Sequence, residues 1–401
     1  MSSTISPPPS HEPGRLGGAG LGRTALGLPF DFVMALAVVG ICACSIVTLR
    51  TVEVPGFPTG FFMQRQAVYF GVGALIALAL SRADYSRLRE LKWATYAVMI
   101  VALLAVMVFG GVARGSRRAI QLPFFSFQAS EIGKVLIVVV LSAFIVDRAR
   151  RLGDRDTTAR AVLLALVPAA LVMLQPDLGS ALVYIAIVVT VLFVAGVPGR
   201  HLAGLGALGA IAIALVLVAA PAAGVEVLQD YQKERLTAFL NPTDDPDDAG
   251  YQQNQSRIAI GSGEKIGRGE AATQTRDNFL PENHTDFAFA ALGERYGFVG
   301  AAILLSFYAL LIWRCLRALT LSKNLFGAIV AGGILAMLLF QVFVNVGMNV
   351  GIMPITGIPL PLMSYGGSSV ITTFVAIGLL LSIHAQGRAA TSSKGRVLGY
   401  T

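Results

Sequence analysis

The sequence has few charged side chains, few cysteines and few histidines, and each shortage excludes a class of protein. Only 13% of the 401 residues are charged, whereas 55% are hydrophobic, and a soluble domain of this size is far less apolar. The three cysteines, Cys42, Cys44 and Cys315, lie within or at the end of apolar runs and lack the spacing of metal ligands. The composition therefore excludes a disulfide-stapled or cysteine-bound metal domain and places the chain in a lipid bilayer.

The apolar residues gather into ten runs of about 20 residues, the length that crosses a ~30 Å hydrocarbon core. Between the seventh and eighth runs lies the only long hydrophilic segment, residues 223–285. We therefore expect an all-α polytopic membrane protein with about ten transmembrane helices and one long extracytoplasmic loop. The predicted spans are 31–49, 66–82, 94–113, 131–147, 161–175, 177–197, 201–222, 286–315, 324–351 and 364–385.

The net charge of +8 does not indicate a nucleic-acid partner, because the basic residues collect in loops on alternate sides of the spans. The segments on the N-terminal side hold 18 of the 31 lysines and arginines. By the positive-inside rule, both termini are cytoplasmic. The short outer loops carry only Arg50, Arg65, Arg114, Arg117 and Arg118.

Three regions are distinguished by composition. Residues 1–28 are rich in proline and glycine, have no signal-peptide pattern, and are predicted to be a disordered cytoplasmic tail. Residues 29–388 form the membrane domain, and 389–401 form a second cytoplasmic tail. Within the loop, VEVLQDYQKERLTAFL predicts a surface helix, and the glycines that follow at 261–269 lack the ending of a phosphate-binding loop.

The stretch FLPENHTDFAFA at 279–290 is the first candidate for chemistry, because it places ionisable groups at the entrance to an apolar span. Asp286 is predicted to be a general base that takes a proton from an incoming hydroxyl. An alternative of equal weight is that Thr285 or Asp286 only caps the following helix. Glu282 and His284 are candidate substrate contacts, although an interfacial histidine needs no such role.

Three further acidic or basic residues lie at predicted span ends. Glu131 and Lys134 are three residues apart, so that they share a helix face and can neutralise one another. The functional interpretation is that Lys134 grips an anionic group while Glu131 holds it in place. Asp177 begins the sixth span, where an acidic residue is also an ordinary helix-capping choice.

Two outer segments complete the candidate site. Arg114, Arg117 and Arg118 oppose the positive-inside trend, which favours phosphate contacts over headgroup contacts. The run MPITGIPLPLMSYGGSS at 353–369 interrupts helical structure with prolines after Asn345 and Asn349, which share one face. Such non-helical backbone is typical of a pocket edge, and Ser364 and Ser368 are its candidate substrate contacts.

Together, QPDLGS at 175–180, FLPENHTDFAFAALGE at 279–294 and MPITGIPLPLMSYGGSS resemble the SEDS (shape, elongation, division and sporulation) family of bacterial cell-wall polymerases. PITGIPLP is more similar to RodA, the elongation member, than to FtsW, the division member. The chain departs from the family pattern at Ala119, Ala129, Arg295 and Tyr296. Among these, Ala119 and Ala129 affect the expected substrate contacts near spans three and four.

The resemblance implies a peptidoglycan glycosyltransferase of the bacterial inner membrane that joins lipid II units. It further implies a class B penicillin-binding protein as the cross-linking partner. Asp286 matches the family's essential aspartate, and Glu131, Lys134 and Asp177 match polar positions of its central cavity. The growing glycan on undecaprenyl diphosphate would be the donor, with Lys134, Arg117 or Arg118 stabilising the departing diphosphate. A divalent cation could share this duty, although the sequence offers no metal-ligand cluster.

The alternatives are a lipid-precursor flippase or transporter, a scaffold without catalysis, and a division-type FtsW polymerase.

Overall fold

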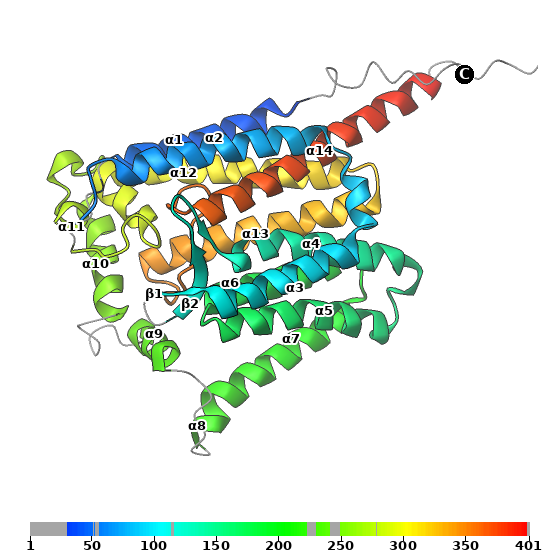
Figure 1. Cartoon of the computed structure of the whole chain (residues 1–401), viewed down its shortest axis with the longest axis horizontal. Coiled ribbons are helices and arrows are strands. Elements are labelled where there is room, and N and C mark those ends of the chain that lie inside the picture. The colour runs from blue at the N-terminus through cyan, green and yellow to red at the C-terminus, as the bar shows by residue number, and fades with distance from the viewer. Residues whose placement is uncertain are drawn as a thin grey trace, which may run out of the picture.

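The computed structural model describes residues 30–50, 52, 56–113, 116–222, 230–240, 249–277 and 279–398. The predicted tail 1–28 lies outside them. Long helices run side by side as one bundle (Figure 1). They are α1 Phe32–Leu49, α2 Phe61–Arg82, α3 Lys92–Phe109, α4 Ala129–Asp147, α5 Arg155–Leu174, α6 Leu178–Val194, α7 Gly199–Ala214, α12 Ala288–Leu321, α13 Leu325–Val350 and α14 Gly367–Leu398.

These helices confirm the all-α membrane fold predicted from hydropathy. Nine of the described helices are long and apolar enough to cross a membrane, counting α7 with the π-helical turn Leu215–Ala219. The shorter apolar helix α6 matches the sixth predicted span, 177–197. The predicted third span was wrong at its end, because α3 stops at Phe109 and a strand follows. Helix α14 extends to Leu398 and so continues into residues 389–401, which were predicted to be a cytoplasmic tail.

Short elements connect the long helices. The 3-10 turns η1 Tyr85–Arg89 and η2 Ala149–Arg151 join helices at one end of the bundle. At the other end, α8 Ala220–Ala222, α9 Asp230–Leu240, α10 Ala249–Ser262, η4 Gly269–Ala271 and α11 Thr273–Arg276 lie between α7 and α12 (Figure 1). Helix α9 falls inside the stretch predicted to be a surface helix, which confirms that helix.

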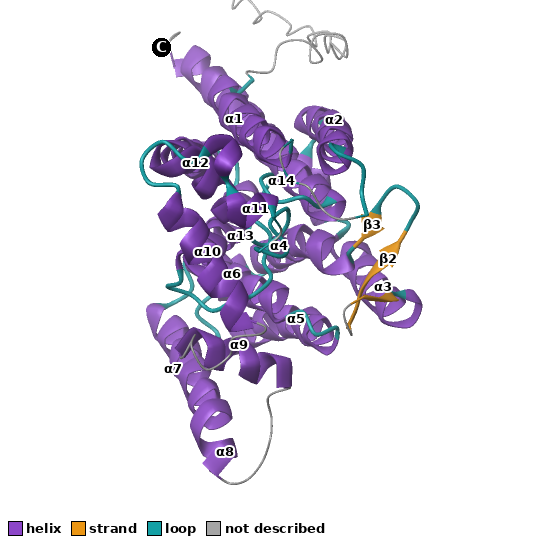
Figure 2. Ribbon diagram, turned by 90° about the vertical axis from the view of Figure 1, so that its left-hand side faces the viewer, coloured by secondary structure: helices purple, strands orange, loops and turns teal. Residues whose placement is uncertain are grey.

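The centre of the bundle is made by α4, α6, α13 and α14. Of the residues in the most apolar stretch of each helix, 83% are buried in α4 and 89% in α14. None are buried in the corresponding stretch of α7. Helix α4 contacts α3, α5, α6, α13 and α14, and Figures 1 and 2 show α7 at the edge of the bundle. The first turns of α4, α6 and α14 are therefore brought together inside the protein.

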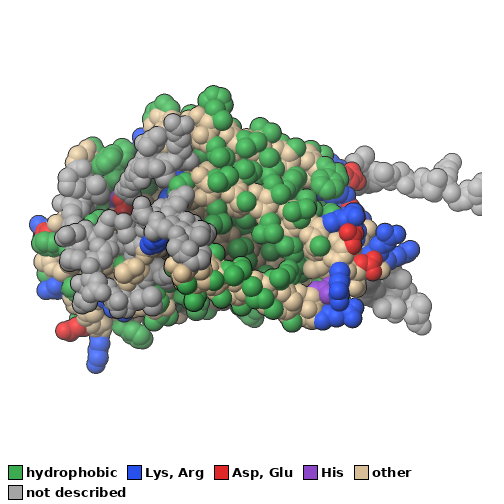
Figure 3. All heavy atoms as spheres, turned by 90° about the horizontal axis from the view of Figure 1, so that it is seen from below, with side chains coloured by type: hydrophobic (Ala, Val, Ile, Leu, Met, Phe, Trp, Pro, Cys, Tyr) green, Lys and Arg blue, Asp and Glu red, His purple; other side chains and the backbone are tan. Residues whose placement is uncertain are grey.

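The surface has an apolar middle between two polar ends. Figure 3 shows hydrophobic side chains over the middle of the bundle and a cluster of basic and acidic side chains at the end where α14 finishes. A buried ion pair at this end joins Arg314 of α12 to Asp31, which caps α1, at 2.7 Å. The distribution follows the alternation of basic loops found in the sequence.

A small antiparallel sheet connects α3 to α4, and no strand was predicted there. Its strands β1 Gly111–Ala113, β2 Ser116–Gln121 and β3 Ser126–Phe127 pair in the order β1-β2-β3. Ile120 pairs with Phe127 in the second ladder. The sheet therefore sits directly before the first turn of α4.

The glycines at 261–269 allow two backbones to pack closely. Helix α12 is broken at Gly297, whose φ is +62° and ψ is −159°. A Cβ atom on Gly267 would lie 2.1 Å from the Arg295 carbonyl oxygen, and one on Gly263 would lie 2.0 Å from the Gly293 carbonyl oxygen. Only glycine fits at these contacts, so that the glycine-rich piece anchors the loop to α12.

Candidate active site

Asp286 lies in a turn at the entrance to α12. The residue is half-buried, and α12 begins two residues later, at Ala288. Its backbone carbonyl accepts hydrogen bonds from the side-chain amides of Asn345 at 3.0 Å and Asn349 at 3.2 Å. The two asparagines share one face of α13, as their spacing predicted. Helix α13 therefore holds the backbone that carries the Asp286 carboxylate.

The N-terminus of α12 is not capped in the way that the alternative interpretation of this turn expected. The N-cap residue is Phe287, which provides no side-chain hydrogen bond. The Thr285 hydroxyl donates instead to the Glu282 carboxylate at 2.5 Å. The amide N–H of Ala290, in the first turn, donates to Asn349 Oδ1 at 3.1 Å. The Asn349 side chain of α13 therefore caps the first turn of α12.

Two further groups face the Asp286 side chain. Gly357, in the non-helical segment between α13 and α14, has a φ of +71°. A Cβ atom there would lie 3.6 Å from Asp286 Oδ2 and 3.8 Å from Nη1 of Arg235, which is on α9. The carboxylate and the guanidinium therefore flank the same small space, which a side chain at position 357 would enter.

The segment between α13 and α14 is tied to the Asp286 turn by Ser364. Its hydroxyl donates to the Thr285 carbonyl at 2.5 Å and accepts from the Leu360 amide at 2.9 Å. The Tyr365 amide donates to the His284 carbonyl at 2.8 Å. The predicted interruption of helix at the prolines is confirmed, because residues 351–366 are non-helical.

His284 packs in an aromatic cluster. Its ring centroid lies 4.5 Å from that of Phe62, on α2, and 6.0 Å from that of Tyr365. Burial, followed by the nearby Tyr69 hydroxyl, raises the pKa of Tyr365 to about 12. The Tyr365 hydroxyl therefore stays protonated at neutral pH, and it does not compete with Asp286 for the role of base.

Asp177 joins the first turns of α4 and α6. Its Oδ1 accepts the Ser180 amide at 3.1 Å, which makes it the N-cap of α6. Its Oδ2 accepts the Ser130 hydroxyl at 2.9 Å and the Gln128 side-chain amide at 3.3 Å. The helix-capping interpretation of Asp177 is thus observed, and the same carboxylate connects two helices.

Glu131 and Lys134 form the ion pair that their spacing predicted. Lys134 Nζ lies 2.6 Å from Glu131 Oε1, and their side chains are 0% and 3% exposed, respectively. Below the pair, a Cβ atom on Gly133 would lie 2.0 Å from the Tyr184 hydroxyl. The ammonium would have to leave this closed site, or the site would have to open, before Lys134 could reach a substrate phosphate.

The small sheet brings its arginines to the same end of the bundle as Asp286. Ser368, at the start of α14, accepts the Gln128 amide at 2.9 Å and donates to the Ser126 carbonyl at 2.6 Å. The Arg118 side chain is half-buried, and its Nε has no hydrogen-bond partner in the described part of the chain. The side chain of Arg117 and all of Arg114 lie outside the described residues.

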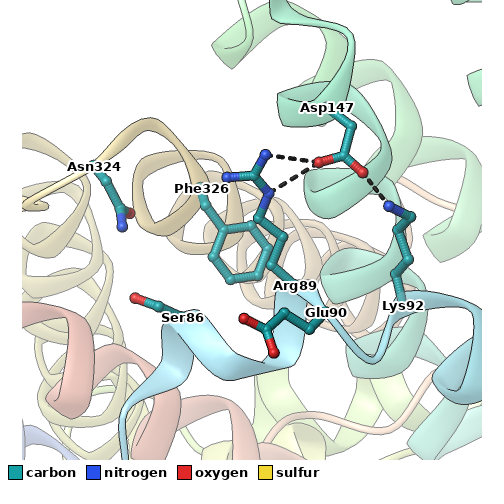
Figure 4. Close-up of a pocket in the computed structure, with 7 residues that line it drawn as sticks. All are labelled: Ser86, Arg89, Glu90, Lys92, Asp147, Asn324 and Phe326. Carbon is teal, nitrogen blue, oxygen red and sulfur yellow. Dashed lines mark hydrogen bonds and ion pairs between the residues drawn. The ribbon is translucent and has the colours of Figure 1, made fainter.

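A pocket lies at the opposite end of the bundle. It has a volume of about 490 Å³, and Figure 4 shows Arg89 and Lys92 both directed at Asp147. Helix α4 begins beside Asp177 and ends at Asp147, so that the pocket is roughly 28 Å from the candidate site at 1.5 Å per residue. Its charges neutralise one another, and it contains none of the predicted site residues.

Nowhere in the described ranges do three histidine, cysteine or acidic side chains come together as a possible metal site. No catalytic step is assigned to the divalent cation considered from the sequence.

Known proteins share both the sequence and this arrangement. The FtsW/RodA/SpoVE family of cell cycle proteins matches residues 26–389. The chain belongs to this family. It is 38% identical over 336 residues to the peptidoglycan glycosyltransferase MrdB of Escherichia coli strain K12, covering 82% of this chain and 88% of that protein. It is 33% identical to the peptidoglycan glycosyltransferase RodA of Treponema pallidum, covering 89% and 98%.

Solved structures agree with the family membership. The chain superposes on part of a peptidoglycan synthase complex that coordinates polymerization and crosslinking, with a TM-score of 0.75 and 33% identity over 90% of this chain and 99% of that chain. The RodA of Thermus thermophilus matches with a TM-score of 0.65 and 30% identity over 89% and 97%. The resemblance drawn from three sequence motifs is thereby confirmed.

Sequence reasoning missed Arg235. The residue lies in a predicted surface helix of mixed charge, where an arginine is unremarkable, and only the fold places it beside Gly357 and Asp286. A signal was present in Gly357, because a glycine between two prolines allows a backbone conformation that other residues avoid.

Proposed function

We propose that this chain is a peptidoglycan glycosyltransferase in which Asp286 is the general base. The observation that carries the proposal is the position of the Asp286 carboxylate. It is half-buried, it faces the Arg235 guanidinium across the space above Gly357, and its backbone is held by two amides of α13. The enzymatic names of the relatives support the assignment of the reaction.

In the proposed reaction, the acceptor is lipid II and the donor is the growing glycan on undecaprenyl diphosphate. Asp286 takes the proton of the acceptor 4-hydroxyl while that oxygen attacks the donor's anomeric carbon. The bond from this carbon to the diphosphate breaks, the diphosphate leaves with the electron pair, and the configuration inverts. The Arg235 guanidinium lies beside the same space as the Asp286 carboxylate, next to Gly357.

The departing diphosphate needs positive charge near it. Arg118 suits this role, because its half-buried side chain keeps an unpartnered Nε at this end of the bundle. Arg117 is the adjacent candidate on β2. Lys134 contributes in this scheme only when it separates from Glu131, so that we assign it a smaller share than the outer arginines.

In this proposal, this end of the bundle faces the outside of the cell, where the substrate and the partner would meet it. Basic residues at the other end support an N-in, C-in orientation in the bacterial inner membrane. The partner in this proposal is a class B penicillin-binding protein, which cross-links the glycan, and the synthase complex among the structural neighbours supports that pairing. PITGIPLP at 354–361 supports an elongation role similar to RodA.

The test uses the purified chain with its cross-linking partner and labelled lipid II in detergent micelles, where transport across a membrane cannot occur. Wild-type protein should produce glycan ladders, and Asp286→Asn should abolish them. Asp277→Asn is the matched control, because Asp277 is an exposed aspartate of the same loop and should leave the ladders intact. Ladders from folded Asp286→Asn protein would remove the general-base assignment. A wild-type protein that moves lipid II across vesicles without polymerising it would favour the transporter alternative.

A further inference from the structure

A fully buried carboxylate lies on α12 that the proposed reaction does not use. Glu294 is 0% exposed, although it sits in a helix that is otherwise largely apolar. Burying a carboxylate without partners is strongly unfavourable. In the described residues, no lysine, arginine or histidine pairs with it, so that hydrogen bonds must stabilise it.

Those hydrogen bonds all come from one short segment of the outer loop. The two Glu294 carboxylate oxygens accept the Gln274 amide at 2.9 Å, the Thr275 amide at 3.0 Å and the Thr275 hydroxyl at 2.7 Å. These donors belong to the first residues of α11. Glu294 thus fixes α11 against the first part of α12.

The segment that Glu294 holds leads directly to Asp286. The Thr275 carbonyl accepts the side-chain amide of Asn283 at 3.0 Å, and the Gln274 carbonyl accepts the Leu280 amide at 3.0 Å. Asn283 is 1% exposed and lies three residues before Asp286. Glu294, Thr275 and Asn283 therefore form a continuous hydrogen-bonded path from α12 to the catalytic turn.

Other elements hold the C-terminal side of the turn that carries Asp286. Helix α13 fixes the Asp286 carbonyl through its two asparagines, and Ser364 fixes the Thr285 carbonyl. The path from Glu294 is a tie on the N-terminal side. In the same stretch, the His284 carbonyl accepts the Tyr365 amide, and Leu280 packs in a small apolar cluster with Phe287.

From this arrangement we infer that Glu294 is a positioning residue, which acts through Thr275 and Asn283 to hold Asp286 in its reactive place. The inference rests on the proposed general-base function of Asp286. A displacement of a catalytic group by about 1 Å can lower a rate roughly 100-fold. Loss of this tie should accordingly lower kcat about 10- to 100-fold and change the KM for lipid II less than about twofold.

The experiment measures kcat and KM for glycan synthesis from labelled lipid II, using the complete chain with its cross-linking partner. Glu294→Gln keeps the shape of the side chain but replaces one acceptor oxygen by a donor. Glu270→Gln is the matched control, because Glu270 is an exposed carboxylate of the same loop and should leave both constants unchanged. A folded Glu294→Gln protein with wild-type kcat would overturn the inference.

Thr275 supplies a second arm in case Glu294→Gln fails to fold. Thr275→Val removes the hydroxyl bond to Glu294 while nearly preserving volume, and Thr275→Ser restores the hydroxyl. We expect kcat to fall in the valine variant and to recover in the serine variant. In the double variant, the losses from Glu294→Gln and Thr275→Val should not multiply, because both break one path. If the two losses of kcat multiply in the double variant, the shared path is contradicted.

The two proposals fail in different ways. If Asp286→Asn remains active, the general-base assignment fails whatever the Glu294 variants do. If Asp286→Asn is inactive while Glu294→Gln, Thr275→Val and the wild type share one kcat, only the positioning role is refuted.

Discussion

The buried pair of Glu131 and Lys134 makes a prediction that separates a structural role from a substrate role. Lys134→Met removes the ammonium and keeps most of the stem. Because both side chains are nearly fully buried and lie 2.6 Å apart, the change leaves a carboxylate without its counter-charge. Breaking one partner of a buried pair costs about 3–5 kcal/mol. The single variant should therefore show a large fall in the midpoint of thermal unfolding.

The matching double variant is Glu131→Gln with Lys134→Met. It removes both charges, so that it does not leave the uncompensated buried charge that destabilises the single variant. Its unfolding midpoint in detergent micelles should therefore lie well above that of Lys134→Met. A double variant no more stable than the single variant would refute the idea that the pair is closed to water.

Activity of the same double variant decides the functional question. If Lys134 grips the substrate diphosphate, the stable double variant polymerises lipid II poorly. If the pair is only structural, the double variant regains both stability and glycan synthesis. The 0% exposure of Lys134 favours the structural role, and we expect at least half of the wild-type activity to return, roughly a 0.4 kcal/mol difference in barrier.

Two other packing contacts give further predictions. Gly133→Ala should destabilise the protein by about 1–3 kcal/mol through overpacking, since the new Cβ would lie 2.0 Å from the Tyr184 hydroxyl. Adding Tyr184→Phe should recover much of the lost thermal stability. If it does not, the strain lies elsewhere. Asn349→Ala should lower both stability, by about 1–3 kcal/mol, and the rate of glycan synthesis, because it leaves the Ala290 amide without its acceptor and removes one of the two hydrogen bonds to the Asp286 carbonyl. A variant that loses only stability would show that Asn345 alone holds the turn.

The membrane fold could be predicted because it depends on local properties of the chain. The ten apolar runs predicted the helical bundle, and the proline-rich segment predicted the non-helical break before α14. The strands before α4 were missed, because β2 includes Arg117 and Arg118 and has no alternating apolar pattern. The continuation of α12 to Leu321 was also missed, because Arg314 and Arg317 interrupt the apolar run there.

The candidate site was predictable only where one residue type carries the signal. A carboxylate at the entrance of a membrane helix is unusual enough to single out Asp286, and the three-residue spacing sufficed for the Glu131–Lys134 pair. Arg235 and Thr275 carry no such signal, because their importance comes from contacts with residues far away in the chain. Ser364 was chosen as a substrate contact, yet its hydroxyl already bridges Thr285 and Leu360, which a sequence motif cannot reveal.

The central claim is most directly tested by the rate of polymer formation at saturating lipid II, compared between wild-type protein and Asp286→Asn. A general base contributes about 10²- to 10⁴-fold, so that the asparagine variant should be slower by at least that lower factor while its unfolding midpoint stays near the wild-type value. A folded variant that polymerises within about tenfold of the wild-type rate, less than a base supplies, would contradict the account.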